Sequence, residues 1–204
     1  MTGMSKPSTR QTKSSTTPPQ RIIVGISGAS GVIYGVRLLQ ALKALPIETH
    51  LVMTRTAEVT LAYETDLKVK AVQALADRVH AIGDMAAPLS SGSFRTLGMV
   101  IAPCSMRSLG ELASGVTSSL LTRAADVVLK ERRKLVLLVR ETPLHNVHLR
   151  NMLTLSEMGA IIAPAMPAFY SRPKTLDEVI DHSVARTLDL FGLSGGSIKR
   201  WAED

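Results

Sequence analysis

Short apolar runs of strand length alternate with helix-length amphipathic segments from residue 21 to residue 191. The runs are typical of buried strands, and the segments between them place apolar residues three or four positions apart, as one face of a helix does. Repeated strand–helix units predict a single parallel sheet with helices on both faces, which is a doubly wound α/β fold. The expected strands are 21–27, 48–54, 99–103, 134–140 and 160–164. The expected helices are 32–45, 67–79, one beginning near 105, 119–133, 147–158 and 175–191.

The size and composition of the chain fit one domain of this kind. Its 204 residues suffice for one substantial core, which must be almost free of aromatic residues because these make up only 3%. A core of Ala, Val, Leu, Ile and Met suits helices layered on a parallel sheet. Residues 1–20 are rich in Ser, Thr, Pro and Lys and offer little to bury. We therefore expect a disordered tail, 1–20, before one domain, 21–204.

Cysteine content and charge limit the compartment and the partners. Cys104 is the only cysteine, which excludes an internal disulfide and predicts a cytoplasmic protein. No apolar run approaches the roughly 20 residues that cross a bilayer, so no membrane association is expected. Three of the 24 basic residues lie in the tail, which leaves 21 against 17 acidic residues. That excess of +4 suits phosphorylated small molecules, and we do not expect a nucleic acid partner.

A glycine-rich turn follows the first expected strand. The segment GISGASGVIYG contains four glycines, Gly25, Gly28, Gly31 and Gly35. Glycines let backbone N–H groups approach an anion, and the N-terminus of the following helix favours negative charge at the same place. Ser27 and Ser30 add hydroxyl groups that we expect to face this space. The turn therefore predicts a cradle for the phosphate of a nucleotide-like cofactor, although it matches neither G-x-G-x-x-G nor a GK[ST] loop, and an ordinary glycine-rich turn is the alternative.

A second turn lies in IAPCSMRSLGELASG, where a strand ends and a helix begins near Ser105. Ligands of open parallel sheets bind beyond the carboxyl ends of the strands, so this turn and the Gly28 turn should flank one crevice. Ser105 and Ser108 carry hydroxyl groups that suit a ring or a ribityl chain. Cys104 has no identifiable base beside it, so we interpret it as a small buried residue rather than a nucleophile.

Basic residues gather in the second half of the chain. Arg123 and Lys130 are two helical turns apart, and Arg140 with Glu141 follows a strongly apolar strand. Arginine side chains bind phosphate oxygens in pairs, so these residues predict a clamp for a second phosphate. Ordinary surface charge is the alternative for the two helical residues. The five histidines show no metal-ligand spacing, and we expect no metal.

Taken together, the segments resemble the UbiX family of flavin prenyltransferases. The resemblance runs in order from residue 21 to residue 201, and the block RAADVVLKERRKLVLLVRETPLH is not a generic α/β pattern. The other matching stretches are GISGASGVIYGVRLL, ETD around Glu64, SSGSFRT, APCSMRSL, HLRNML, PAMPAFYSRP, VARTLDLFGL and a closing RW.

The resemblance implies a flavodoxin-like (Rossmann-like, three-layer) fold and a homo-oligomer, by family precedent a dodecamer, with sites shared between subunits. It implies that a dimethylallyl group from dimethylallyl phosphate is joined to N5 and C6 of reduced FMN, giving a cofactor for a UbiD-type decarboxylase. The residues that it assigns to FMN are Gly28, Ala29, Ser30, Thr54, Ser105, Met106, Arg107, Ser108 and Arg140. Those that it assigns to the prenyl phosphate are Arg123, Lys130, Arg140, Tyr170 and Arg186. The catalytic residues that it implies are Ser30, Glu64, Lys130 and Glu141, and it implies no metal.

Two other functions stay open on the sequence. A flavin-dependent decarboxylase would share the FMN turn, but the cysteine decarboxylases carry P-x-M-N where this chain has PAMP, with Pro167 in the place of Asn. A non-enzymatic FMN-binding accessory subunit of an aromatic-acid decarboxylase would not require Glu64, Lys130 or Glu141.

Overall fold

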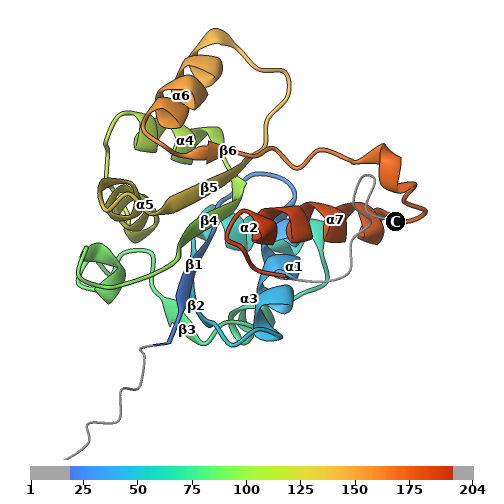
Figure 1. Ribbon diagram of the computed structural model, residues 1–204, viewed down its shortest axis with the longest axis horizontal. Helices are drawn as coiled ribbons and strands as arrows, with labels where there is room; N and C mark the ends of the chain where they lie inside the picture. Colours follow the sequence, from blue (N-terminus) through green and yellow to red (C-terminus); the bar gives the residue numbers. More distant parts are fainter. Residues whose placement is uncertain (1–18, 195–204) are drawn as a thin grey trace, which may run out of the picture.

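Six parallel strands form one sheet at the centre of the computed structural model, which describes residues 19–194 (Figure 1). Their order across the sheet is β3-β2-β1-β4-β5-β6. The strands are β1 (Arg21–Ile26), β2 (Glu48–Met53), β3 (Arg78–His80), β4 (Gly98–Cys104), β5 (Lys134–Val139) and β6 (Ile161–Ile162). The prediction of a doubly wound parallel sheet in a Rossmann-like, three-layer fold is confirmed.

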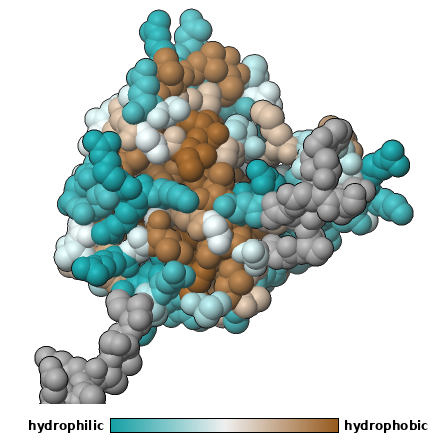
Figure 2. All heavy atoms as spheres, in the orientation of Figure 1, coloured by the Kyte–Doolittle hydropathy of each residue, from teal (hydrophilic) through white to brown (hydrophobic). Residues whose placement is uncertain are grey.

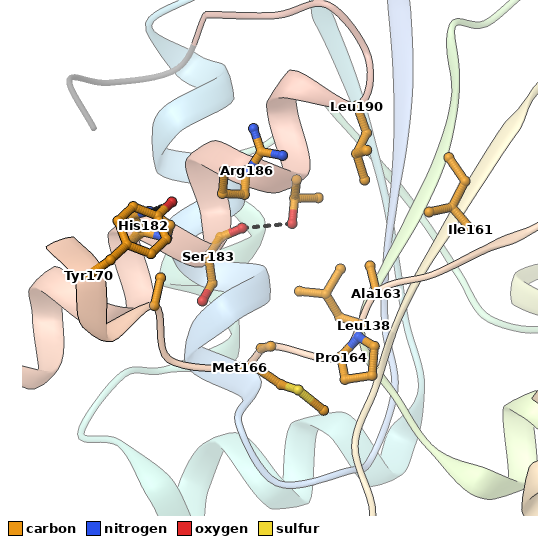
Figure 3. A pocket seen from close by; sticks show the side chains of 13 residues that line it. Leu138, Ile161, Ala163, Pro164, Met166, Tyr170, His182, Ser183, Arg186 and Leu190 are labelled. Carbon is orange, nitrogen blue, oxygen red and sulfur yellow. Dashed lines mark hydrogen bonds between the residues drawn. The ribbon is translucent and has the colours of Figure 1, made fainter. Parts of the chain in front are cut away.

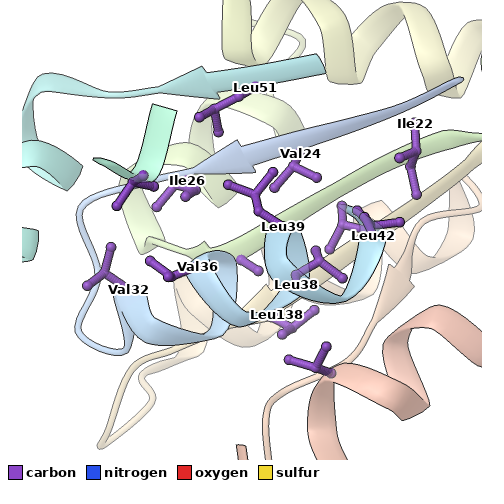
Figure 4. Close-up of a cluster of buried hydrophobic side chains, with 14 of the residues drawn as sticks. Ile22, Val24, Ile26, Val32, Val36, Leu38, Leu39, Leu42, Leu51 and Leu138 are labelled. Atoms are coloured by element: carbon purple, nitrogen blue, oxygen red, sulfur yellow. The ribbon is translucent and has the colours of Figure 1, made fainter. Parts of the chain in front are cut away.

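Alternate residues of each strand point to opposite faces of this sheet, and each face has its own apolar core. Val24 and Ile26 of β1 belong to the first core, in which α1 (Val32–Lys43) and α7 (Leu176–Asp189) pack (Figure 4). Ile23 belongs to the second core, beneath α4 (Met106–Ala113) and α5 (Leu120–Lys130). Both faces are covered, which is why the central strands are apolar at nearly every position.

The remaining helices are α2 (Arg55–Glu64), α3 (Val69–Gln73) and α6 (Asn146–Glu157), with short 3₁₀ turns at Pro88–Ser90 and Phe169–Ser171. Helix α6 contributes a single buried residue, Leu155, so most of its apolar side chains remain exposed. Figure 2 shows hydrophobic residues over α6 and along the middle of the same face.

The order in which strands are added to the sheet reverses between β1 and β4. Strands β2 and β3 extend the sheet on one side of β1, and β4 to β6 extend it on the other. Neighbouring strands connect to opposite faces at this point, which opens a crevice beyond their carboxyl ends. The register pairs Gly25 with Ile101, so β1 and β4 end at nearly the same level.

Close packing of α1 on the sheet depends on Gly35. A Cβ atom at this position would lie 2.4 Å from the carbonyl oxygen of Ala102 in β4. Gly35 therefore allows the close contact between helix α1 and the sheet, and it does not lie at the crevice.

The prediction for residues 55–80 was wrong. Helix α2 was not predicted, because only Ala57 and Leu61 of its residues are buried and the apolar pattern is weak. The expected helix 67–79 is reduced to the five residues of α3, and β3 begins at Arg78. Because β3 is a short edge strand without a fully buried residue, its sequence lacks the apolar run that marks the other strands.

The expected tail lies outside the described residues except for Pro19 and Gln20, and so does the closing segment at Trp201. Within residues 19–194, none of the helices has the length and apolar character needed to span a membrane.

Candidate active site

Three strands end at polar residues that meet in one cavity. Ser27 follows β1, Thr54 follows β2 and Ser105 follows β4, and all three line a space of about 290 Å³ that we call the N-terminus cavity. The predicted crevice between the Gly28 turn and the Ser105 turn is therefore confirmed. Its other lining residues are Gly28, Arg55, Thr56, Ile82, Arg107, Ser108, Glu111, Ser118, Ser119, Leu121 and Thr122.

Three helices begin at this cavity, since the N-caps of α2, α4 and α5 (Thr54, Ser105 and Ser119) all line it. Thr54 Oγ1 accepts a hydrogen bond from the Ala57 N–H at 3.0 Å at the start of α2, and Ser105 Oγ accepts one from the Ser108 N–H at 3.3 Å at the start of α4. Each cap satisfies one of the four N–H groups that a helix leaves without an internal acceptor at its first turn. The remaining N–H groups and the positive ends of the helix dipoles favour an anion in this space.

The Gly28 backbone lies directly against the first turn of α2. A Cβ atom on Gly28 would come within 2.4 Å of the Thr56 Cβ atom, so no other residue fits without displacing this turn. The close approach brings the β1 turn and the start of α2 to the same wall of the cavity. A group of the size of a phosphate and ribityl chain, with its many oxygen acceptors, fits this set of hydroxyl and backbone donors.

Ser27 lines the N-terminus cavity, but its hydroxyl group is bonded to the protein itself. It donates to the carbonyl oxygen of Pro103 at 2.7 Å and accepts a hydrogen bond from the Ser105 N–H at 2.8 Å. The Ser27 side chain is almost fully buried in this position. It therefore acts as a bridge that fixes the β1 turn against the β4 turn.

The N-terminus of α1 is also used differently from the prediction. The backbone N–H groups of Gly31 and Val32 donate to the Glu64 carboxylate at 2.9 to 3.1 Å. A negative charge of the protein itself therefore occupies the position expected for a phosphate. The helix N-termini that remain available to an anion at the N-terminus cavity are those of α2, α4 and α5.

A second cavity, of about 380 Å³, is lined by Ser30, which follows Gly28 by two residues. We call it the turn cavity; its polar lining includes Ser30, Arg140 and Glu141. Ala29 connects the two cavities along the chain, and Met106 packs against the second apolar core instead of lining either. Glu64 reaches the backbone of Gly31, next to Ser30, and Glu141 lines the same cavity as Ser30, so three of the four predicted catalytic residues lie at or beside the turn cavity.

A third cavity, of about 400 Å³, lies against α7 and holds Tyr170 and Arg186 (Figure 3). We call it the α7 cavity. It shares four lining residues with the turn cavity, so the two cavities adjoin along one cleft region; these residues are Leu138, Pro164, Ala165 and Met166. The cleft therefore has an apolar floor, with Arg140 in one part and Arg186 in the other. Arg186 also donates to the Asp189 carboxylate at 2.7 Å.

The five residues predicted to bind the prenyl phosphate do not lie together within one chain. Arg123 donates to the Asp126 carboxylate at 2.8 Å and to the carbonyl oxygen of Ser90 at 3.3 Å, and Lys130 pairs with Glu131. Both belong to α5, which packs in the second core, whereas the α7 cavity adjoins the first. The sheet separates them because the apolar side of α5 faces it and leaves these cations on the far surface.

The prediction for Cys104 is confirmed. Its side chain has no exposed surface, and burial raises the pKa of the thiol to about 12. A thiol in this state is a poor nucleophile. Among the described residues, no group of three or more His, Cys, Asp or Glu side chains is arranged to hold a metal ion.

Sequence reasoning missed two sets of lining residues. Arg55 and Thr56 belong to the unpredicted helix α2, and the Thr54 cap was the available signal for its start. Ser119 and Thr122 form a capping box at the start of α5, a pattern readable from the sequence. His182 gave no signal at all, because a single histidine in an amphipathic helix is usually a packed residue.

Known proteins match the chain over most of its length. The family model described as Flavoprotein matches residues 10–188. The flavin prenyltransferase UbiX of Escherichia coli K12 is 60% identical over 176 residues, which is 86% of this chain and 93% of that protein. A probable UbiX-like flavin prenyltransferase of Bacillus subtilis is 56% identical over 181 residues, 89% of each chain.

Solved structures agree with the sequence relatives. A crystal structure of AnUbiX (PadA1) with FMN and dimethylallyl pyrophosphate has a TM-score of 0.88 and 53% identity, over 90% of this chain and 97% of that one. The FMN-dependent cysteine decarboxylase TvaF is only 17% identical, with a TM-score of 0.57 over 71% of this chain and 89% of that one, so it shares the fold alone. The chain belongs to the flavoprotein family and, within it, to the UbiX flavin prenyltransferases.

Proposed function

We propose that the protein joins a dimethylallyl group from dimethylallyl phosphate to N5 and C6 of reduced FMN, and that the prenylated FMN serves a UbiD-type decarboxylase. The observation that carries this proposal is a set of three cavities: one at the N-termini of α2, α4 and α5, one lined by Ser30 and Arg140, and a largely apolar one that holds Tyr170 and Arg186. Such a path suits two phosphorylated substrates placed end to end. AnUbiX, at 53% identity, was crystallised with FMN and dimethylallyl pyrophosphate.

The residues of the first cavity suit the phosphate end of FMN. Gly28, Thr54, Ser105, Arg107 and Ser108 supply hydroxyl groups, a cation and backbone donors there, and Ala29, Ser30, Met106 and Arg140 complete the proposed FMN set. Reduced FMN supplies the nucleophilic nitrogen and carbon atoms of the reaction. The chain's own contribution is to hold these atoms at the entrance of the apolar cleft.

The residues of the α7 cavity suit the departing phosphate. An allylic carbon–oxygen bond breaks readily only when the negative charge on the leaving phosphate is stabilised in place. Arg140 and Arg186 carry that charge compensation, and the Tyr170 hydroxyl adds a hydrogen bond. The apolar residues Leu138, Ala165 and Met166 line the cavity between Arg140 and Arg186. They would exclude water from the allylic cation that forms when the phosphate departs.

Three groups at the turn suit proton transfer during ring closure. Glu64 accepts hydrogen bonds from the backbone next to Ser30, and Glu141 follows Arg140 on the opposite wall of the turn cavity. We propose Ser30, Glu64 and Glu141 as the groups that move or hold these protons, with Lys130 as a further catalytic cation.

A second copy of the chain would supply Arg123 and Lys130. These residues lie on the face opposite α7, so a neighbouring protomer must carry them to the prenyl phosphate. The exposed apolar residues of α6 (Val147, Leu149 and Leu153) are suited to such assembly. A UbiX-like protein of E. coli O157:H7, at 52% identity, is dodecameric, and we propose the same assembly here.

We also propose that residues 21–204 form one flavin-binding domain and that residues 1–20 are a tail that is not part of it. We further propose that the protein is cytoplasmic. The single cysteine of the chain supports the latter proposal, since Cys104 is buried and makes no disulfide.

The test is anaerobic incubation of the protein with reduced FMN and dimethylallyl phosphate, followed by mass spectrometry of the released flavin. We expect a gain of one C₅H₈ unit. Arg186→Gln should abolish this gain without loss of FMN binding, and Lys174→Gln, which removes an exposed positive charge from the same region, should leave it intact. Bound FMN that keeps its mass with the wild-type protein would contradict the proposal and favour the accessory-subunit function.

A further inference from the structure

Tyr170 lies on a segment that the core does not hold in place. The 3₁₀ turn Phe169–Ser171 has no buried residue, and 77% of the neighbouring Phe169 is exposed. Yet the Tyr170 hydroxyl must be placed accurately if it is to contact a phosphate in the α7 cavity. Some other group therefore has to fix the position of this side chain.

His182 of α7 makes that contact. Its Nε2 atom lies 3.2 Å from the Tyr170 hydroxyl oxygen, at hydrogen-bonding distance. The two rings also meet edge to face, with centroids 5.7 Å apart and planes at 82°. Figure 3 shows the rings in contact at the side of the cavity. Only 8% of His182 is exposed, so its ring is held by its surroundings.

The helix under His182 is itself firmly anchored. Ile180 and Val184, on either side of it in sequence, are buried in the first apolar core. Asp181 accepts two hydrogen bonds from the Arg37 guanidinium of α1. The position of His182 is therefore fixed by the core, with little contribution from the exposed Arg37 contact, and independently of the loop that carries Tyr170.

Arg186 follows His182 by one helical turn and lines the same cavity. A contact that fixes Tyr170 on His182 thus also fixes the Tyr170 hydroxyl relative to the Arg186 guanidinium. The two groups would approach one phosphate from two sides, which requires a constant spacing between them.

We propose that His182 is a positioning residue for the prenyl phosphate, and this inference rests on the proposed function. In this proposal its Nε2–H donates to the Tyr170 oxygen, and the Tyr170 hydroxyl donates to an oxygen of the bound phosphate. A hydroxyl group that accepts one hydrogen bond while donating another is also the better donor, because the two bonds polarise it in the same direction.

The experiment measures KM for dimethylallyl phosphate and kcat for prenylated FMN formation in variants of the whole protein. His182→Leu keeps the bulk and removes the donor; we expect KM to rise about tenfold with kcat within about threefold, and the FMN affinity unchanged. His182→Gln keeps an N–H donor of suitable reach and should restore KM to within about threefold of wild type. His182→Asn, whose amide is too short to reach, should behave like His182→Leu and replaces it if that variant does not fold.

Two controls separate positioning from a general loosening of α7. Asp181→Asn weakens the contact to Arg37 on the same helix turn and should leave KM within about twofold, since an exposed ion pair contributes little. In a Tyr170→Phe background, His182→Leu should have no further effect on KM, because the hydroxyl on which His182 acts is gone.

The proposal is overturned if KM is unchanged in both His182→Leu and His182→Asn, if Gln fails to restore it, or if the effect of His182→Leu persists in the Tyr170→Phe background. Failure of the proposed function gives a different result, because the wild-type protein would then bind FMN and form no prenylated product.

Discussion

Replacing Ser27 by alanine removes one oxygen atom and two hydrogen bonds from the junction between the first and fourth strands. The hydroxyl donates to Pro103 O at 2.7 Å and accepts from the Ser105 N–H at 2.8 Å, at a site that is 1% exposed. The lost bond to Pro103 is worth about 1 kcal/mol, and the Ser105 N–H left without its acceptor adds about 1 to 3 kcal/mol. Ser27→Ala should therefore destabilise the fold by about 2 to 4 kcal/mol.

Thermal unfolding measures this cost, which corresponds to a fall in Tm of roughly 5 to 15 °C for a domain of this size. Because Ser105 also caps α4, we expect the FMN dissociation constant, from fluorescence titration, to rise at least about fivefold as the two turns separate. Ser156→Ala, at an exposed position of α6, is the matched control and should change Tm by less than about 2 °C. A Ser27→Ala protein that melts with the wild type would refute the assignment of Ser27 as the bridge between the turns.

Three further predictions follow from contacts elsewhere in the fold. Burial lowers the pKa of His50 from 6.5 to about 4, so the fold favours its neutral form; stability present above pH 6.5 should be lost as the pH falls toward 4, by up to about 3 kcal/mol. When Tm is measured against pH, the fall in Tm between pH 6.5 and pH 4 should be smaller for His50→Asn than for the wild type. An equal fall in both proteins would contradict this prediction. Gly35→Ala should cost about 2 to 4 kcal/mol by denaturant unfolding, because its Cβ meets Ala102 O at 2.4 Å, whereas Gly83→Ala, with no atom within 4 Å, should be near neutral. Glu64→Gln should lower stability by only about 1 kcal/mol but product formation at least about tenfold; wild-type turnover would remove Glu64 from the proton-handling set.

The central part of the fold was predictable because its signal is local. Strands buried on both faces, such as β1 and β4, appear as continuous apolar runs, and each leads into a helix with a recognisable start. Edge elements lack this signal: β3 pairs with one neighbour only and buries no residue fully, so its sequence resembles the end of a helix.

The site was predictable in its residue types and less so in its connections. The rule for parallel sheets correctly placed Gly28 and Ser105 at one crevice. It could not show that the Glu64 carboxylate, 33 positions further along the chain, accepts hydrogen bonds from the Gly31 N–H and so occupies the place expected for a phosphate. Nor could helical spacing show on which side of the sheet Arg123 would lie, because that depends on how α5 packs.

The placement of Arg123 and Arg186 on opposite faces has a consequence for mixed assemblies. Arg123→Ala and Arg186→Gln proteins would each be inactive alone, since every site in either assembly lacks one cation. If subunits of the two variants are unfolded together and reassembled at equal amounts, about a quarter of the interfaces should combine an intact Arg186 from one chain with an intact Arg123 from the next. Activity would then return without any wild-type chain being present, which is the result that the proposed site between two subunits requires.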